Sequence, residues 1–195
     1  VYGKTFNILT YMSNRVLEYK QKYNLGFALY GTPSESLCDR FARVDKQEFG
    51  DIKGITDKGY YDNSFHVSSR INMSPFEKLK LEALGHKYST GGHISYIETD
   101  SLTKNLEAIP EILRYAKMVG IHYMGINQPV DKCHICGYKG EFTATKEGFT
   151  CPQCGNHDSN EMSVIRRVCG YLSQPNARPF NKGKQEEIMH RVKHS

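Results

Sequence analysis

The sequence predicts an α/β fold with a small cysteine-containing module appended to it. Two observations support this prediction. Across residues 1–130, short apolar segments alternate with amphipathic helical segments. This is the pattern of an α/β sheet or an α/β barrel, and it does not choose between the two. After Pro129 the character changes, and a segment containing glycine, cysteine and aromatic residues runs to about Asn156.

Three regions follow from this change in character. We expect an α/β domain over residues 1–130, a four-cysteine module over 131–160, and a loop followed by a basic helix over 161–195. A chain of 195 residues is long enough for one domain of ordinary size and a small module. Because the chain begins with Val1 and helical periodicity is already present by Phe6, we interpret it as a piece of a longer protein.

The first fifty residues predict two helices separated by a buried strand. Apolar residues recur at helical spacing from Tyr2 to Tyr23, which predicts an amphipathic helix. The apolar run from Leu25 to Tyr30 is typical of a buried strand. Thr32-Pro33-Ser34-Glu35 then supplies an N-cap, a proline suited to the first helical turn and a capping-box glutamate, so we expect a helix from there to about Gly50. The apolar face of this second helix is expected to carry Leu37, Phe41 and Val44.

The next segment, residues 51–73, is rich in Gly, Asp, Asn, Ser and Tyr and predicts a long loop. A second capping box at Ser74-Pro75-Phe76-Glu77 predicts a helix that stops at Gly85. The remaining elements of this region are expected to be a strand over His93–Ile97, a helical stretch over Leu102–Met118 interrupted by Pro110 and closed by Gly120, and a strand over Ile121–Ile126.

The composition is that of a globular and mildly basic chain. Hydrophobic residues make up 38% and charged residues 24%, which excludes a disordered polar chain. No apolar run approaches the roughly 18 residues of a membrane span, and no secretory leader opens the chain. We therefore expect a cytoplasmic protein with no membrane partner. The net charge of +5 favours anionic partners without choosing between a nucleotide and a nucleic acid.

Two CxxC hooks carry the strongest signal in the sequence. Four of the six cysteines form Cys133-His-Ile-Cys136-Gly and Cys151-Pro-Gln-Cys154-Gly. Such hooks present four thiolates tetrahedrally and close the coordination sphere, leaving no open position for water or substrate. We therefore predict one structural zinc ion bound by Cys133, Cys136, Cys151 and Cys154, with a hairpin over Tyr138–Thr150, rather than disulfides or unrelated buried cysteines.

Directly after this module comes Arg166-Arg167-Val168-Cys169-Gly170-Tyr171-Leu172. The motif resembles the Arg-Val-x-Gly-Tyr fingerprint of the glycyl radical enzymes. The continuation Pro175-Asn-Ala-Arg-Pro-Phe-Asn181 and the tail Gly183-Lys-Gln-Glu-Glu through Arg191-Val-Lys-His194 resemble the anaerobic (class III) ribonucleotide reductases in particular. A four-cysteine module just before the motif points the same way. The whole chain is similar to the C-terminal part of their large subunit, especially in T-even-type bacteriophages.

The resemblance implies that Gly170 stores the radical. A Cα-centred radical shares its spin with the flanking amide nitrogen and carbonyl, which requires a planar Cα that a side chain would crowd. An ordinary turn glycine is the alternative, and the length of the match favours the radical. The thiyl cysteine of the family lies on an upstream loop that nothing in residues 1–195 matches. Cys169 and Cys38 are therefore expected to be small packing residues.

The turn at Thr32, Ser34 and Ser36 is the candidate substrate-binding site. It lies at an expected strand-to-helix junction, where exposed N–H groups and the helix dipole attract anions and the three hydroxyls add donors. The resemblance supports phosphate binding here, because ribonucleotide reductases hold substrate phosphates at a Ser/Thr-rich turn. A plain capping box is the alternative, and Glu35 would oppose a phosphate that it faced. Ser89-Thr90-Gly91-Gly92-His93 is a lesser candidate.

The resemblance also implies the activity of the complete protein and its partners. It implies a glycyl-radical-type α/β barrel in a homodimeric, allosteric enzyme that converts ribonucleoside triphosphates to deoxyribonucleotides for DNA replication. An iron–sulfur activating enzyme would generate the radical with S-adenosylmethionine, and formate would be the reductant. This piece is expected to be inactive without the remainder of the reductase chain, which carries the thiyl cysteine.

A non-catalytic zinc-ribbon protein that binds nucleic acid is the alternative function. It explains the CxxC hooks and the charge of +5 but not the motif from Arg167 to Tyr171. We therefore expect no direct binding of nucleic acid.

Overall fold

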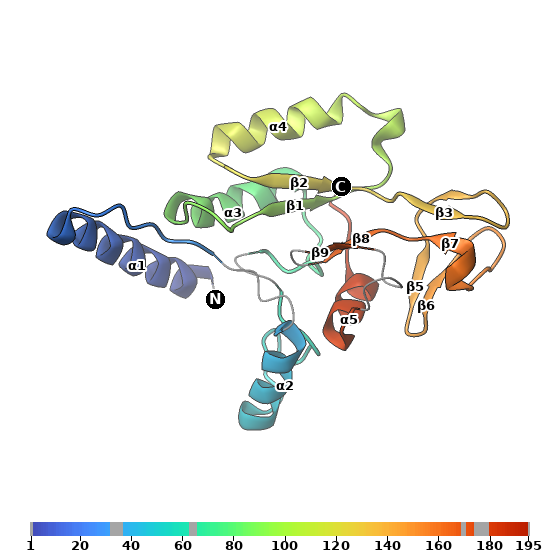
Figure 1. Cartoon of the computed structure of the whole chain (residues 1–195), viewed down its shortest axis with the longest axis horizontal. Helices are drawn as coiled ribbons and strands as arrows, with labels where there is room; N and C mark the ends of the chain where they lie inside the picture. The colour runs from blue at the N-terminus through green and yellow to red at the C-terminus, as the bar shows by residue number, and fades with distance from the viewer. Residues whose placement is uncertain (1, 32–36, 63–65, 169–170, 174–179, 195) are drawn as a thin grey trace.

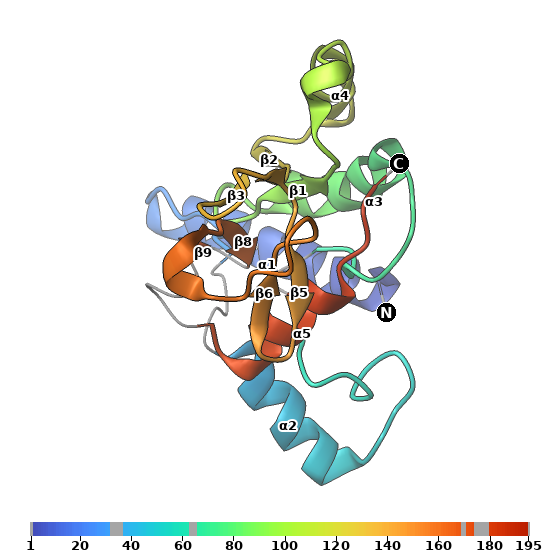
Figure 2. The ribbon, with the colours of Figure 1, turned by 90° about the vertical axis from the view of Figure 1, so that its right-hand side faces the viewer.

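The computed structural model describes residues 2–31, 37–62, 66–168, 171–173 and 180–194. Its fold is mixed α/β, as the sequence predicts, with α4 and α2 at opposite ends of the molecule (Figures 1 and 2). No helix in these ranges is both long enough and apolar enough to cross a bilayer.

The central sheet consists of two parallel strands, β1 (Ser95–Glu98) and β2 (Met124–Asn127). Side chains alternate between the two faces of a strand. Ile97 is fully buried on the face that packs against α3 (Pro75–Tyr88) and α4 (Ala108–Val119), in a cluster with residues of both helices. Tyr96 and Glu98 lie on the opposite face, which the candidate site uses.

The start of α3 agrees with its local signal, and its end does not. Ser74 caps α3 through a complete capping box, with its Oγ 3.2 Å from the N–H of Glu77. The predicted stop at Gly85 is wrong, because α3 continues to Tyr88. His86, the residue after Gly85, is buried, and its Nε2 lies 3.0 Å from Ser95 Oγ of β1. These tertiary contacts extend the helix past Gly85.

The helical stretch predicted around Pro110 is two elements. A short 3₁₀ helix, η1 (Leu102–Lys104), precedes α4, and Pro110 occupies the first turn of α4, where its missing N–H is tolerated. Gly120 ends α4 in the left-handed conformation with φ of 88°, as the prediction of a closing glycine requires.

The first helix, α1 (Tyr2–Tyr23), has the predicted bounds, but the strand predicted over Leu25–Tyr30 does not form. A single parallel bridge pairs Tyr30 with Gly91. An apolar run becomes a strand only where a neighbouring strand pairs with it. Here the pairing is limited to Tyr30 and Gly91.

The second helix, α2 (Cys38–Phe49), ends at Gly50 as predicted but presents a different face. Phe41 and Val44 are 46% and 45% exposed, whereas Cys38 and Ala42 are buried. The reason is its partner, since Cys38 packs against Phe180 and Ile188 of the C-terminal region. The predicted start of this helix, Thr32 to Ser36, lies outside the described residues.

The cysteine-containing module is built from short antiparallel strands. β3 (Asp131–Cys133) pairs on one side with β4 (Lys139–Gly140) and on the other with β7 (Met162–Ser163), which follows η2 (Ser159–Glu161). The predicted hairpin between the hooks is β5 (Thr143–Thr145) with β6 (Gly148–Thr150). The module has its own core, which contains Cys133, Phe142, Cys151, Met162 and Val164.

The C-terminal region leaves the module and returns to the central sheet. β8 (Arg166–Val168) pairs antiparallel with β9 (Tyr171–Ser173), with Val168 opposite Tyr171. The last helix, α5 (Lys182–His190), starts at Asn181, whose side chain accepts a 3.0 Å hydrogen bond from the N–H of Lys184. It contacts β5, β8 and α2.

Candidate metal centre and the neighbouring cavity

The four cysteines of the two hooks meet at one point in the module. Their Sγ atoms all lie within 4.8 Å of one another, and the pairs Cys133–Cys154 and Cys136–Cys151 are each 3.7 Å apart. This separation excludes a disulfide, in which the sulfurs are about 2.05 Å apart. Four Zn–S bonds of about 2.3 Å in a tetrahedron place the sulfurs about 3.8 Å apart. The donor set and its spacing therefore fit a tetrahedral metal ion.

Each hook turns through a glycine in the left-handed conformation. Gly137 has φ of 75° and donates its N–H to Cys133 O at 3.1 Å, and Gly155 has φ of 72° and donates to Cys151 O at 2.9 Å. A side chain is strained at such angles, which explains the glycine after each CxxC. The two hooks thus have the same local geometry, and each presents a buried cysteine from its first position.

The electrostatics of the cluster favour a bound cation. Backbone N–H groups of Cys136 and Ile135 lower the pKa of Cys133 to about 6. The N–H of Tyr138 acts in the same direction on Cys136, but burial and the neighbouring thiols outweigh it and raise the pKa of Cys136 to about 12. Four thiolates cannot coexist at these distances without a positive charge between them, and a divalent metal supplies it.

A buried ion pair connects the module to β8. Asp131 is 1% exposed and accepts hydrogen bonds from the N–H groups of Phe142 at 2.8 Å and Ile165 at 3.3 Å. Both of its carboxylate oxygens bind the guanidinium of Arg166, with 2.6 Å between Oδ2 and Nη2. The same guanidinium lies 5.0 Å from the centre of the Phe149 ring. The first residue of β8 is therefore fixed to the first residue of β3.

We predict that Asp131→Ala destabilises the module strongly, because it leaves the buried guanidinium of Arg166 without its counter-charge. Breaking a buried pair in this way costs about 3–5 kcal/mol. The midpoint of urea unfolding, followed together with metal release, measures the effect. Glu111→Ala is the matched control, since the Glu111–Arg114 pair is 65% and 69% exposed and should contribute little. A midpoint that shifts equally in both variants would contradict the prediction.

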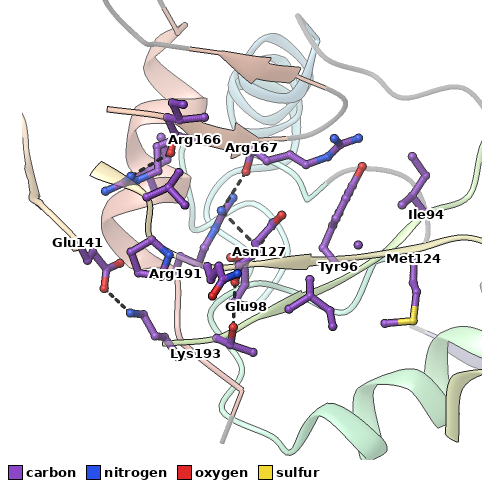
Figure 3. Close-up of a pocket in the computed structure, with 18 of the residues that line it drawn as sticks. Ile94, Tyr96, Glu98, Met124, Asn127, Glu141, Arg166, Arg167, Arg191 and Lys193 are labelled. Carbon is purple, nitrogen blue, oxygen red and sulfur yellow. Dashed lines mark hydrogen bonds and ion pairs between the residues drawn. The ribbon is translucent and has the colours of Figure 1, made fainter. Parts of the chain in front are cut away.

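A cavity of about 470 Å³ separates β8 from the free face of the central sheet (Figure 3). Tyr96 lies on its wall, and the guanidinium of Arg167 is 4.7 Å from the centre of the Tyr96 ring. Arg191 and Lys193 reach the cavity from the end of the chain, where Lys193 Nζ is 2.6 Å from Asp100 Oδ1 and also binds Glu141. The cavity therefore brings together the sheet, the cysteine-containing module, β8 and the C-terminal segment.

The other predicted site residues lie partly outside the described ranges. Gly170, with Cys169, connects the paired ends of β8 and β9 and is not described, and neither are Thr32, Ser34 and Ser36. Gly31, just before them, donates its N–H to Gly91 O at 2.9 Å. Gly31 is thus in contact with the lesser candidate at Ser89–His93.

Sequence reasoning missed the contact group formed by Tyr96, Arg167 and Arg191. These residues belong to three segments far apart in the chain, and no spacing pattern links them. Tyr96 shows only as a residue of the strand predicted over His93–Ile97, and Arg191 only as a residue of the C-terminal tail.

Comparison with known proteins gives a family match over almost the whole chain. A family profile described as anaerobic ribonucleoside-triphosphate reductase matches residues 3–194. The anaerobic ribonucleoside-triphosphate reductase of Escherichia coli K12 is 48% identical over 98% of this chain and 27% of its own length. The enzyme of the same name from phage T4 is 48% identical over 96% of this chain and 31% of its own length. The chain thus spans less than a third of these relatives.

Solved structures of anaerobic ribonucleotide reductases share the fold. One aligns with a TM-score of 0.71 at 21% identity, covering 97% of this chain and 28% of its own. The Thermotoga maritima enzyme in complex with dATP and CTP aligns with a TM-score of 0.63 at 21% identity, over 93% and 27%. In both alignments, the fold of this chain corresponds to less than a third of the larger solved chain.

Proposed function

This chain belongs to the anaerobic ribonucleoside-triphosphate reductase family, and we propose that it carries the radical-storing part of such an enzyme. The complete protein would convert ribonucleoside triphosphates to deoxyribonucleotides. The observation that carries the proposal is the direct attachment of the β8–β9 pair, which flanks Gly170, to the four-cysteine module through Asp131 and Arg166.

In this proposal the four cysteines hold zinc, which would fix the two hooks relative to each other without taking part in the reaction. The ion pair between Asp131 and Arg166 then holds the start of β8 against the start of β3. The Gly170 radical takes the hydrogen atom of a cysteine thiol elsewhere in the complete chain, which leaves a thiyl radical. The thiyl radical takes the ribose 3′ hydrogen, and the 2′-hydroxyl takes up a proton and leaves as water. Formate supplies two electrons and a proton as it is oxidised to carbon dioxide, and the cysteine returns the 3′ hydrogen to the ribose.

The test is anaerobic activation of the complete protein with an iron–sulfur activating enzyme and S-adenosylmethionine. A glycyl doublet in the low-temperature EPR spectrum, together with formate-dependent deoxyribonucleotide formation, would support the proposal. The second candidate, a nucleic-acid-binding zinc ribbon, is favoured only by the four-cysteine cluster and the charge of +5. DNA binding without any radical signal would favour that candidate instead.

For the substrate, we propose that Thr32, Ser34 and Ser36 bind the phosphates. Thr32→Ala and Ser34→Ala in the complete enzyme should each raise the Kd for a ribonucleoside triphosphate roughly tenfold, because a hydrogen bond to a charged group contributes about 1.5–3 kcal/mol. The radical yield should not change. Thr103→Ala, which alters an exposed hydroxyl, is the control. Unchanged nucleotide affinity in both variants would contradict phosphate binding and leave helix capping as the role of this turn.

A further inference from the structure

The last described residues run from α5 to the end of β1. Val192 donates its N–H to Ser69 O at 2.8 Å, and His194 donates its N–H to Glu98 O at 2.8 Å. Glu98 in turn donates its N–H to His194 Nδ1 at 2.9 Å. His194 therefore lies beside the last residue of β1. These contacts hold the segment that contains Arg191, the residue after α5, against the end of β1.

Arg191 joins three elements through one guanidinium. Its Nη1 donates to Arg167 O of β8 at 2.9 Å and lies 3.3 Å from Glu98 Oε1 of β1. Its Nη2 donates to Glu187 Oε1 of α5 at 2.8 Å. The contacts with Arg167 and Glu98 are drawn in Figure 3. The side chain is 14% exposed, so solvent screens these contacts weakly.

The two carboxylates hold the guanidinium in this orientation. Glu98 also accepts a 2.8 Å hydrogen bond from Asn127 Nδ2 of β2, which ties its carboxylate to the sheet. Burial raises the pKa of Glu187, and the charge of Arg191 opposes that rise. A planar guanidinium presents N–H donors in several fixed directions, whereas a lysine ammonium is a single point charge. Because Nη1 contacts Glu98 and the carbonyl while Nη2 contacts Glu187, the three contacts need two nitrogens held in one plane, which arginine provides.

We propose that Arg191 is a positioning residue that fixes β8 through the carbonyl of Arg167, three residues before Gly170. Asp131 holds β8 from the module at Arg166, and Arg191 holds it from the sheet at the next residue. A shift of about 1 Å at a reacting atom lowers the rate of a transfer step by as much as a hundredfold. The inference rests on the proposed function, because it concerns the placement of the proposed radical residue.

The test compares variants of the complete reductase chain after anaerobic activation. Arg191→Ala and Arg191→Lys should retain zinc and bind nucleotide, yet their glycyl EPR signal per chain should fall at least fivefold. Lysine keeps a positive charge near Glu98 and Glu187, but its single nitrogen cannot occupy the positions of both Nη atoms at once. Guanidinium chloride at millimolar concentration should restore the signal of the alanine variant. Arg114→Ala, which alters an exposed pair, is the control.

Two results would overturn the role of Arg191. One is a wild-type radical yield in Arg191→Ala, and the other is a loss in that variant that guanidinium leaves unchanged. A failure of the proposed function has a different outcome, because the wild-type protein itself would then show no glycyl doublet.

Discussion

Replacement of Cys133 by serine should abolish metal binding and unfold the cysteine-containing module. Cys133 is fully buried, ends β3 and belongs to the core of the module, so its loss removes both a ligand and the order that the ligand imposes. A structural zinc ion contributes on the order of 10 kcal/mol to the folding of such a site. Metal analysis should find about one zinc per wild-type chain, with four sulfur neighbours by X-ray absorption, and almost none in the variant.

Cys38→Ser is the matched control for this prediction. Cys38 is also buried, but it packs against Phe180 and lies outside the cluster, so its replacement should leave the zinc content unchanged. Protein purified without chelators that contains no metal, or a disulfide at Cys133, would contradict the assignment of zinc.

Local signals in the sequence predicted those parts of the fold that depend on neighbours in the chain. The capping box at Ser74 and Glu77 needs only residues three positions apart, and the structure confirms it. Two CxxC hooks likewise contain the turn geometry that each half of the cluster requires. Their fourteen-residue separation leaves room for the β5–β6 hairpin, which was also predicted.

Features that depend on distant partners were predicted wrongly or missed. The run from Leu25 to Tyr30 has strand-like composition, but only Tyr30 finds a pairing partner. The face of α2 was assigned from its own apolar residues, whereas the packing of Cys38 is decided by Phe180, 142 residues later. The contacts of Arg191 with Arg167 and Glu98 are invisible in the sequence for the same reason.

The last prediction concerns Gly170, for which the largest effect on activity is expected. Gly170→Ala in the complete protein should fold and bind zinc, because one methyl group in a loop is a modest perturbation unless φ is positive. It should nevertheless show no glycyl doublet and no turnover, since the methyl group hinders the planar radical. Cys169→Ala is the adjacent control and should keep both, because Cys169 is expected only to pack. A normal doublet in the Gly170→Ala variant would exclude the assignment.

Oxygen supplies a second measurement of the same prediction. Exposure of the activated wild-type protein to air should break the backbone at Gly170 and release a peptide that begins near Tyr171, which mass spectrometry detects. An intact chain after activation and exposure to air would count against Gly170. The isolated 195 residues should form no deoxyribonucleotide in any case, because the thiyl cysteine is expected elsewhere in the complete chain. Product formation by this piece alone would place the catalytic thiol within it, and Cys169 would be the first residue to replace.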